Sequence, residues 1–318
     1  MEATRRADHA QALAEFDAAF AGHVRFTLSN MARALVMGLT GSHFVGVPAD
    51  VAPEMRRHYQ KLTRFSAALA FVSDVSMGVL GGALKRKEKL SARLGDVLSA
   101  LYLCSATLKR YEDEGRHKAD APLAHWAVWD AMFKAQNAFE GVISNFPSRL
   151  IAAVVGRIVF PLGRPYVVPS DRLGHQGARL LIEPSATRDR LTAGIYIDAR
   201  ASDPVREIEL ALAAPVAAEP IEAKVRVAVK KGRIVAKLPP GAGPEVLDAR
   251  AVEAGVITAD EARVLAEQRA LTASVVRVDD FGPDLGASLL VPPQPVTVHA
   301  AAVRQPQAAK PVGERAAA

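Results

Sequence analysis

Apolar residues recur at three- and four-residue steps over long stretches of this chain, which is the spacing of one face of an α-helix. The first stretch covers residues 10–40, with a break expected near Gly22 and an end where glycine and proline gather at Gly41 and Pro48. A second helix is expected over about residues 53–83. Its periodic apolar positions are Leu62, Phe65, Leu69, Val72, Val79 and Leu80.

The segment LKRKEKLSARLGDVLSALYL, residues 84–103, begins with a cluster of charged residues and continues almost without them. Its later part carries a stripe at the spacing of a helix face that packs on a core. The stripe consists of Leu90, Leu94, Val97, Leu98 and Leu101. Because glycine inside a helix costs about 1 kcal/mol relative to alanine, Gly95 is expected to allow tight backbone contact with a neighbouring helix.

Turn and capping residues indicate where the following helices start and stop. Gly115 suits the left-handed cap of the helix before it, and Asp120 with Pro122 starts a helix that extends to about residue 144. Further on, Ser170 and Ser185 each precede a short helical pattern. The sequence therefore predicts successive helices with short connections up to about residue 198.

Beyond residue 198 alanine, valine, glutamate and proline repeat without the periodicity of a long helix. Thr258 and Glu261 form a capping box ahead of one further helix. The end of the chain is rich in proline and alanine and has little to bury, which is typical of disorder. We therefore expect an all-α protein, with a helical bundle over residues 1–198, a smaller and mostly helical annex over residues 199–290, and a disordered tail over residues 291–318.

The amino-acid composition favours a helical fold, and the net charge indicates which kinds of partner the chain can bind. Half of the 318 residues are hydrophobic but only 6% are aromatic, a balance that favours helices packed through small residues. The formal net charge of +6 favours anionic partners. Basic and acidic residues are nevertheless interleaved, without the Lys/Arg tract of a DNA-binding arm. We expect no binding to nucleic acid.

The compartment is indicated by the cysteine count and the start of the chain. A single cysteine, Cys104, permits no intrachain disulfide, which is typical of the reducing cytoplasm. The opening MEATRRADHAQALAEF lacks the apolar core of a signal peptide. No uninterrupted apolar stretch reaches the roughly 18 residues that span a bilayer. We expect a cytoplasmic protein that binds the inner membrane peripherally at most.

Common catalytic and metal-binding motifs are missing from the sequence, including H-E-x-x-H, G-x-S-x-G and the phosphate-binding loop. The most acidic cluster, Glu112, Asp113 and Glu114, lies at a helix C-terminus, where negative charge opposes the helix dipole. Two interpretations stay open: a buried general base for proton abstraction, or a solvated helix end with ion pairs. We assign no catalytic residue and no metal ligand.

Lys85, Arg86, Lys87 and Lys89 form the one candidate binding site. They start a helix, and the amide groups of a helix N-terminus can themselves bind a phosphate. An acidic ligand, a lipid surface or carboxylates of another domain would each explain these cations, and so would solvation of an exposed helix end. The four side chains are predicted to contact an anion or a partner.

Residues 149–164, RLIAAVVGRIVFPLGR, are apolar through their centre and have arginine at both ends. Such a composition resembles a helix that lies on a membrane surface, but the polar face is too thin for a strongly amphipathic pattern. A helix that is apolar nearly all round is normally interior. We therefore expect this helix to be buried in the bundle.

Several segments resemble, in the same order, the C-terminal region of the large bacterial fatty acyl-CoA dehydrogenases of β-oxidation. The longest runs from SDVSMG to DAPLAHW and covers residues 73–126. The others are NFPSR (145–149), FPLGR (160–164), PSDRLGH (169–175), PSATRDRLTAGIY (184–196), VITADEARVL (256–265) and VDDF (278–281). Ordered agreement over most of the chain is far more specific than one motif. The tail and parts of the annex are not covered.

The resemblance implies a flavoprotein oxidoreductase. In that family a glutamate removes the α-proton of an acyl-CoA while the β-hydride goes to N5 of FAD, which leaves a trans-2-enoyl-CoA. The flavin-binding core and that glutamate precede the matched region, and none of their motifs can be placed here. We therefore expect the C-terminal helical part of an acyl-CoA dehydrogenase, inactive alone, which reaches FAD and acyl-CoA through a dehydrogenase core as its partner. The alternative is a non-catalytic helical module that binds a membrane surface or a partner.

Overall fold

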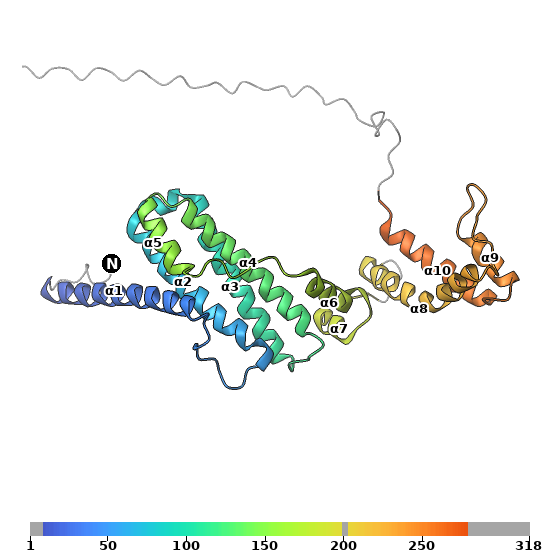
Figure 1. Ribbon diagram of the computed structural model, residues 1–318, viewed down its shortest axis with the longest axis horizontal. Helices are drawn as coiled ribbons and strands as arrows, with labels where there is room; N and C mark the ends of the chain where they lie inside the picture. Colours follow the sequence, from blue (N-terminus) through green and yellow to red (C-terminus); the bar gives the residue numbers. More distant parts are fainter. Residues whose placement is uncertain (1–8, 199–202, 279–318) are drawn as a thin grey trace, which may run out of the picture.

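The computed structural model describes residues 9–198 and 203–278, and no β-strand occurs among them. These residues form ten α-helices and two short 3-10 helices (Figure 1). The α-helices are α1 (His9–Leu39), α2 (Arg56–Leu80), α3 (Glu88–Asp113), α4 (Ala121–Ser144), α5 (Arg149–Val159), α6 (Asp171–Ile182), α7 (Ala186–Thr192), α8 (Pro204–Lys230), α9 (Glu245–Glu253) and α10 (Ala259–Val276); the 3-10 helices are η2 (Pro53–Met55) and η3 (Gly81–Arg86). The predicted all-α fold is confirmed.

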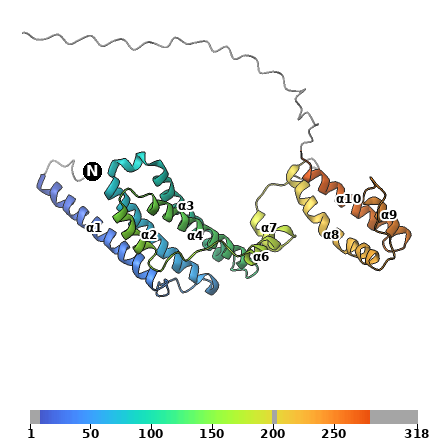
Figure 2. The same ribbon diagram turned by 45° about the horizontal axis from the view of Figure 1, so that its top comes forward.

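Helices α1 to α5 pack into a bundle, and α6 and α7 lie against the end of α4 (Figures 1 and 2). The closest pair is α3 and α4, which a short connection joins. Aromatic rings fill the centre, where Phe65 lies 5.7 Å from Phe139 and 5.6 Å from Tyr166 between ring centroids, both edge to face. Each large apolar side chain that is fully buried contributes roughly 1.5–3 kcal/mol, so this shared core stabilises the bundle.

A second, smaller hydrophobic cluster forms where α8, α9 and α10 pack on one another. Its most buried members are Ala218, Ala251 and Leu265. Arg188 on α7 connects the two parts, because its Nη1 donates to Glu209 Oε2 on α8 at 2.8 Å. The boundaries of the predicted bundle and annex stay a prediction, and the predicted tail, residues 291–318, lies outside the described residues.

Helix α8 corrects the expectation that no long helix follows residue 198. It is 27 residues long and contains Pro215 and Pro220. A proline in a helix interior removes one backbone hydrogen bond and crowds the preceding turn. The contact of α8 with α10 buries Ile221 and Val225, and this packing compensates for the poor helix propensity.

Two expected helix boundaries were wrong. Helix α1 continues through Gly22, because one glycine costs only about 1 kcal/mol and the alanines at positions 18, 19 and 21 favour the helix. Helix α3 starts at Glu88 rather than at Leu84, since Gly81 ends α2 with a φ of +49° and residues 81–86 form η3. Three of the cations in residues 84–89 therefore precede the α-helix.

The predicted seam of α3 is only partly correct. Leu90, Val97 and Leu101 are buried, but Leu98 is 61% exposed. The expected close contact at Gly95 was wrong, because no atom of a neighbouring element lies within 4 Å of the position that a Cβ would occupy there. The tightest approach of this kind in the bundle is at Gly38 instead, where that position lies 2.6 Å from Pro161 Cγ.

The predicted helix caps agree better with the structure than the predicted helix boundaries do. Ser170, Ser185 and Thr258 each accept a backbone N–H bond at the start of their helix, and Glu261 completes the capping box. Gly115 adopts a φ of +99° just after α3 ends. These signals act within a few residues of the helix end, which is why they can be read without the fold.

Helix α5 is buried on one face only. Ala152, Val155, Ile158 and Val159 pack into the core, so the expected burial in the bundle is confirmed for this face, whereas Leu150 and Val154 are exposed. Separately, α2 with its 3-10 flanks, Pro53–Arg86, is long and apolar enough to cross a membrane by length and composition. Helix α2 also supplies core residues of the bundle, among them Phe65 and Phe71.

Candidate functional site

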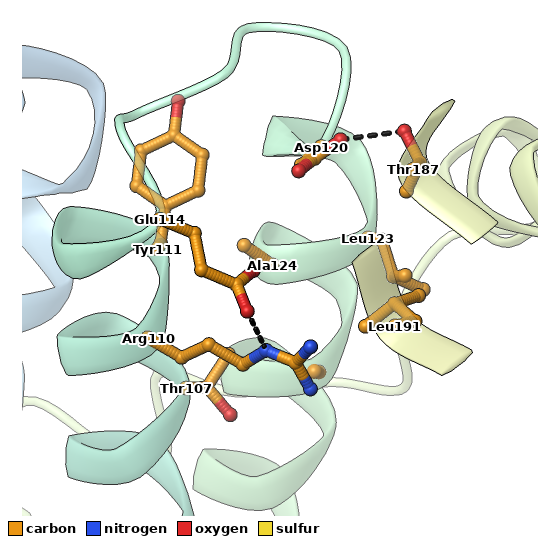
Figure 3. Close-up of a pocket in the computed structure, with 10 residues that line it drawn as sticks. Thr107, Arg110, Tyr111, Glu114, Asp120, Leu123, Ala124, Thr187 and Leu191 are labelled. Atoms are coloured by element: carbon orange, nitrogen blue, oxygen red, sulfur yellow. Dashed lines mark hydrogen bonds and ion pairs between the residues drawn. The ribbon is translucent and has the colours of Figure 1, made fainter. Parts of the chain in front are cut away.

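A pocket of about 240 Å³ lies between the C-terminal part of α3, the start of α4 and helix α7 (Figure 3). Leu123, Ala124 and Leu191 give it an apolar lining. Charged side chains, Arg110, Glu114 and Asp120, form its rim. A site of this composition suits a small apolar group beside polar contacts.

Asp120 at the N-terminal end of α4 holds α7 against the bundle. Its Oδ1 accepts a hydrogen bond from Thr187 Oγ1 at 2.5 Å, and its Oδ2 accepts one from Arg190 Nε at 3.0 Å. Burial opposes ionisation of this carboxylate, but the hydrogen bonds from Arg190 and Thr187 outweigh it and hold the pKa of Asp120 below its ordinary value. Asp120 occupies the predicted N-cap position, yet its side chain bonds to α7 and makes no cap.

Arg110 forms the opposite rim of the pocket. Its Nε donates to Glu114 Oε1 at 2.8 Å, and its Nη2 donates to the backbone oxygen of Arg190 at 3.1 Å. The first of these contacts is drawn in Figure 3. The charged groups of the rim therefore bind one another, and they fasten α7 to both α3 and α4.

The acidic cluster at the end of α3 is distributed over three separate contacts. Glu112 Oε1 accepts a hydrogen bond from the amide of Ala52 at 2.9 Å. Its Oε2 forms an ion pair with Arg116 at 2.5 Å, although the angles are not those of a hydrogen bond. Asp113 pairs with Lys109 and Glu114 with Arg110. This arrangement supports the interpretation as an ion-paired helix end.

The four predicted cations lie at the other end of α3. Lys85 and Arg86 are in η3, Lys87 is at the N-cap of α3 and Lys89 is in its first turn, all exposed. Helix α3 has 26 residues, which corresponds to about 39 Å, so the structure does not bring these side chains to the pocket. Their contact with an anion or a partner stays a prediction.

Two histidines, which sequence reasoning missed, meet between α2 and α4. His58 Nε2 lies 2.7 Å from His125 Nδ1, so one ring donates and the other accepts. Burial, with smaller contributions from His125 and Lys61, lowers the pKa of His58 to about 4. Burial also lowers the pKa of His125, against the attraction of Glu54. They are 67 residues apart, and no local pattern connects them.

Among the described residues, no group of three or more His, Cys, Asp or Glu side chains could hold a metal ion. Cys104 is fully buried, and burial raises the pKa of its thiol to about 12, so it is not a reactive nucleophile. The described residues thus define an all-α domain in which some ion pairs, such as Arg190 with Asp120 and Arg269 with Asp248, join different helices.

Comparison with known families identifies this domain. The family described as acyl-CoA dehydrogenase, C-terminal, bacterial type, matches residues 1–281. The chain belongs to this family, as its ordered sequence segments indicate. The match also includes residues 1–72 and 197–255, which lie outside the resembling segments. No solved structure matches the chain.

Proposed function

We propose that this chain is the C-terminal helical part of an FAD-dependent acyl-CoA dehydrogenase of fatty acid β-oxidation, which converts acyl-CoA to trans-2-enoyl-CoA. The observation that carries the proposal is the family match over residues 1–281. The chain serves the dehydrogenase by packing on its flavin-binding core. It shapes the acyl tunnel or the contact between subunits, and it contributes no chemistry itself.

The hydrogen bonds of the carboxylates in the pocket support the proposal that the isolated chain is inactive. Proton abstraction next to a carbonyl is favoured when a desolvated carboxylate has a raised pKa. Asp120 is the opposite case, because its hydrogen bonds to Arg190 and Thr187 lower its pKa. Glu114 is likewise engaged by Arg110. We therefore assign the catalytic base to the dehydrogenase core.

The pocket also does not fit FAD. Its volume of about 240 Å³ is below the roughly 300–1,000 Å³ that enclose drug-sized ligands, and FAD is larger than most of those. The cation on its rim that a flavin diphosphate would need, Arg110, is already bound to Glu114. FAD is accordingly assigned to the core, and acyl-CoA reaches this chain only through that core.

An exposed apolar surface on α3 supports the proposed contact with the core. Leu98 and Tyr102 lie one turn apart on this helix and are 61% and 71% exposed. Adjacent exposed apolar side chains of this size are typical of a surface that binds another protein. We assign this surface of α3 to the dehydrogenase core.

The alternative function is a non-catalytic module that binds a membrane surface or a partner in the cytoplasm. The exposure of Lys85, Arg86, Lys87 and Lys89 is the observation that favours it. Sedimentation with vesicles of phosphatidylglycerol, compared with phosphatidylcholine, tests this function. Reversing the charge of Lys85, Arg86 and Lys87 would abolish binding to the anionic vesicles if the cluster is the contact, and unchanged sedimentation would remove the cluster from it.

The main proposal is tested with the purified chain alone and after co-expression with the flavin-binding core of a bacterial acyl-CoA dehydrogenase. We expect no flavin absorbance and no acyl-CoA oxidation from the chain alone, and co-purification of the chain with an active yellow core. The Leu98→Glu variant should reduce co-purification, whereas Lys134→Glu on α4 should not. Stoichiometric FAD or turnover in the chain alone would contradict the assignment of chemistry to the core.

A further inference from the structure

Helix α2 carries three cations on one face. Arg57, Lys61 and Arg64 are four and three residues apart, a spacing that places them on the same side of a helix. Burial lowers the pKa of Lys61, repulsion from Arg57 and Arg64 lowers it further, and no carboxylate opposes these effects. Nor does a carboxylate act on the pKa of Arg64, which burial also lowers. Within the described part of the chain, the charges of Lys61 and Arg64 are therefore not neutralised by an ion pair.

Arg64 is buried with most of its hydrogen-bonding capacity unused. It is 7% exposed, and its Nη2 donates to the backbone oxygen of Val159 at 2.8 Å, the one acceptor that it meets among the described residues. Its Cζ lies 5.7 Å from the ring centroid of Phe65. A guanidinium has five N–H donors. Because a buried charge without partners is costly, the remaining donors call for a water molecule or an anion.

Lys61 covers two aromatic rings without meeting a hydrogen-bond acceptor in the described residues. Its Nζ lies 5.1 Å from the ring centroid of Trp129 and 5.1 Å from that of Tyr166. Cation–π contacts of this kind hold the ammonium group in place but leave its three N–H donors free. Since Lys61 is only half-buried, these donors can be reached from solvent.

The hydroxyl of Tyr166 is a third donor without a partner. Tyr166 is 2% exposed, and its hydroxyl oxygen forms no hydrogen bond with the described residues. The backbone holds the residue instead, because Gln136 Nε2 donates to its carbonyl oxygen at 2.7 Å and its amide donates to Gln136 Oε1 at 2.9 Å. Burial raises the pKa of the hydroxyl and Cys104 adds to the rise, whereas Arg64 and Arg57 oppose it. The hydroxyl thus lies within electrostatic range of these two cations, and the fold leaves it unused.

We propose that Lys61, Arg64 and Tyr166 form a binding site for a phosphate group. All three side chains have free donors and two of them are cationic, which is the complement of an oxyanion. A planar guanidinium suits phosphate oxygens in particular, and Arg57 adds positive charge one turn before Lys61. This inference goes beyond the proposed function and does not depend on it, because neither FAD nor acyl-CoA is assigned to this face of α2.

The site is tested by isothermal titration calorimetry of the full chain with inorganic phosphate, with sodium chloride at equal ionic strength as the reference. We expect saturable binding, and Lys61→Met should weaken it by about tenfold or more, because a charge-assisted hydrogen bond is lost. Lys134→Met is the matched control, since Lys134 is exposed and pairs with Asp130 on α4. The absence of saturable binding, or an equal loss in both variants, would overturn the proposal.

A free phosphate ion and a phosphate carried by a larger molecule share this chemistry. Glycerol phosphate, titrated in the same way, distinguishes these sources. Tighter binding of the ester than of inorganic phosphate, lost in Lys61→Met, identifies a phosphate carried by a larger molecule. Weaker binding of the ester identifies the free ion.

Tyr166→Phe separates a role in ligand binding from a role in the fold. Without phosphate the variant should melt at the temperature of the wild type or above it, because no hydrogen bond among the described residues is lost from the hydroxyl. Saturating phosphate should raise the melting temperature of the wild type, and that of the variant by less. A variant that melts lower without phosphate, or that gains as much from phosphate as the wild type, would overturn the assignment of the hydroxyl to the site.

Discussion

His58 on α2 and His125 on α4 share a single hydrogen bond, with His58 Nε2 2.7 Å from His125 Nδ1. Such a bond requires at least one neutral ring, because two imidazolium groups would both donate and would repel each other. His58 is 8% exposed, and its neutral form is the one that the fold accommodates. The contact therefore joins two helices of the bundle in a manner that depends on pH.

This histidine pair predicts lower stability in mild acid. The pKa of His58 is about 4 in the folded chain and 6.5 in the absence of burial, so the unfolded chain takes up a proton first. The free energy of unfolding should have its full value above about pH 6.5. It should fall by on the order of 3 kcal/mol as the pH drops from 6.5 toward 4. Urea unfolding followed by circular dichroism between pH 7.5 and 4 measures this loss.

A histidine elsewhere supplies the control for that experiment. His23→Gln changes an exposed side chain on α1 and should keep the pH dependence of the wild type. His58→Gln should lower stability at pH 7.5 and flatten the loss between pH 6.5 and 4. The same slope in wild type and His58→Gln would assign the acid sensitivity to other groups.

Removal of the Asp120 carboxylate is expected to release α7. Asp120→Ala leaves Thr187 and Arg190 without their acceptor, and a lost hydrogen-bonded charge of this kind costs about 1–3 kcal/mol. Limited proteolysis should then cut the chain near α7 faster than in the wild type. Asp113→Ala removes an acidic residue from an exposed pair with Lys109 and should change cleavage little. Equal protection in both variants would argue against the role of Asp120.

Replacing Gly95 or Gly38 by alanine should change the stability of the chain in opposite directions. Gly95→Ala adds a methyl group into open space on α3 and should stabilise the chain by up to about 1 kcal/mol. At Gly38 the new Cβ would lie 2.6 Å from Pro161 Cγ, so Gly38→Ala should destabilise it. Thermal unfolding of the two variants provides the comparison, and a lower melting temperature for Gly95→Ala would contradict this account.

An ion pair in the smaller cluster gives a fourth test. Asp248 is 6% exposed, and its Oδ1 accepts a hydrogen bond from Arg269 Nη2 at 3.0 Å. Arg269→Ala leaves a buried carboxylate unpaired and should loosen α9 and α10, at a cost of about 1–3 kcal/mol. Arg263→Ala breaks only exposed contacts on the same helix. Hydrogen exchange in α9 and α10 should accelerate in the first variant and not in the second.

Sequence alone was sufficient for the features that depend on neighbouring residues. The caps at Ser170, Ser185 and Thr258, the turn at Gly115 and the helical class all follow from contacts within about four residues. The ordered segments that identified the family are likewise properties of the chain as a string of residues. Predictions from the same local rules failed where packing overrides them, as at the two prolines inside α8.

Tertiary structure decided which groups meet. Asp120 reads as a helix cap in the sequence but binds α7, and Gly95 reads as a packing contact but faces open space. His58 and His125 become partners only because the bundle brings these points of α2 and α4 together. The apolar spacing of α1 indicated a buried face, yet the bundle is too short to cover Leu13 to Val24. Periodicity specifies a face within one helix, whereas the lengths and positions of the neighbouring helices determine how much of that face is covered.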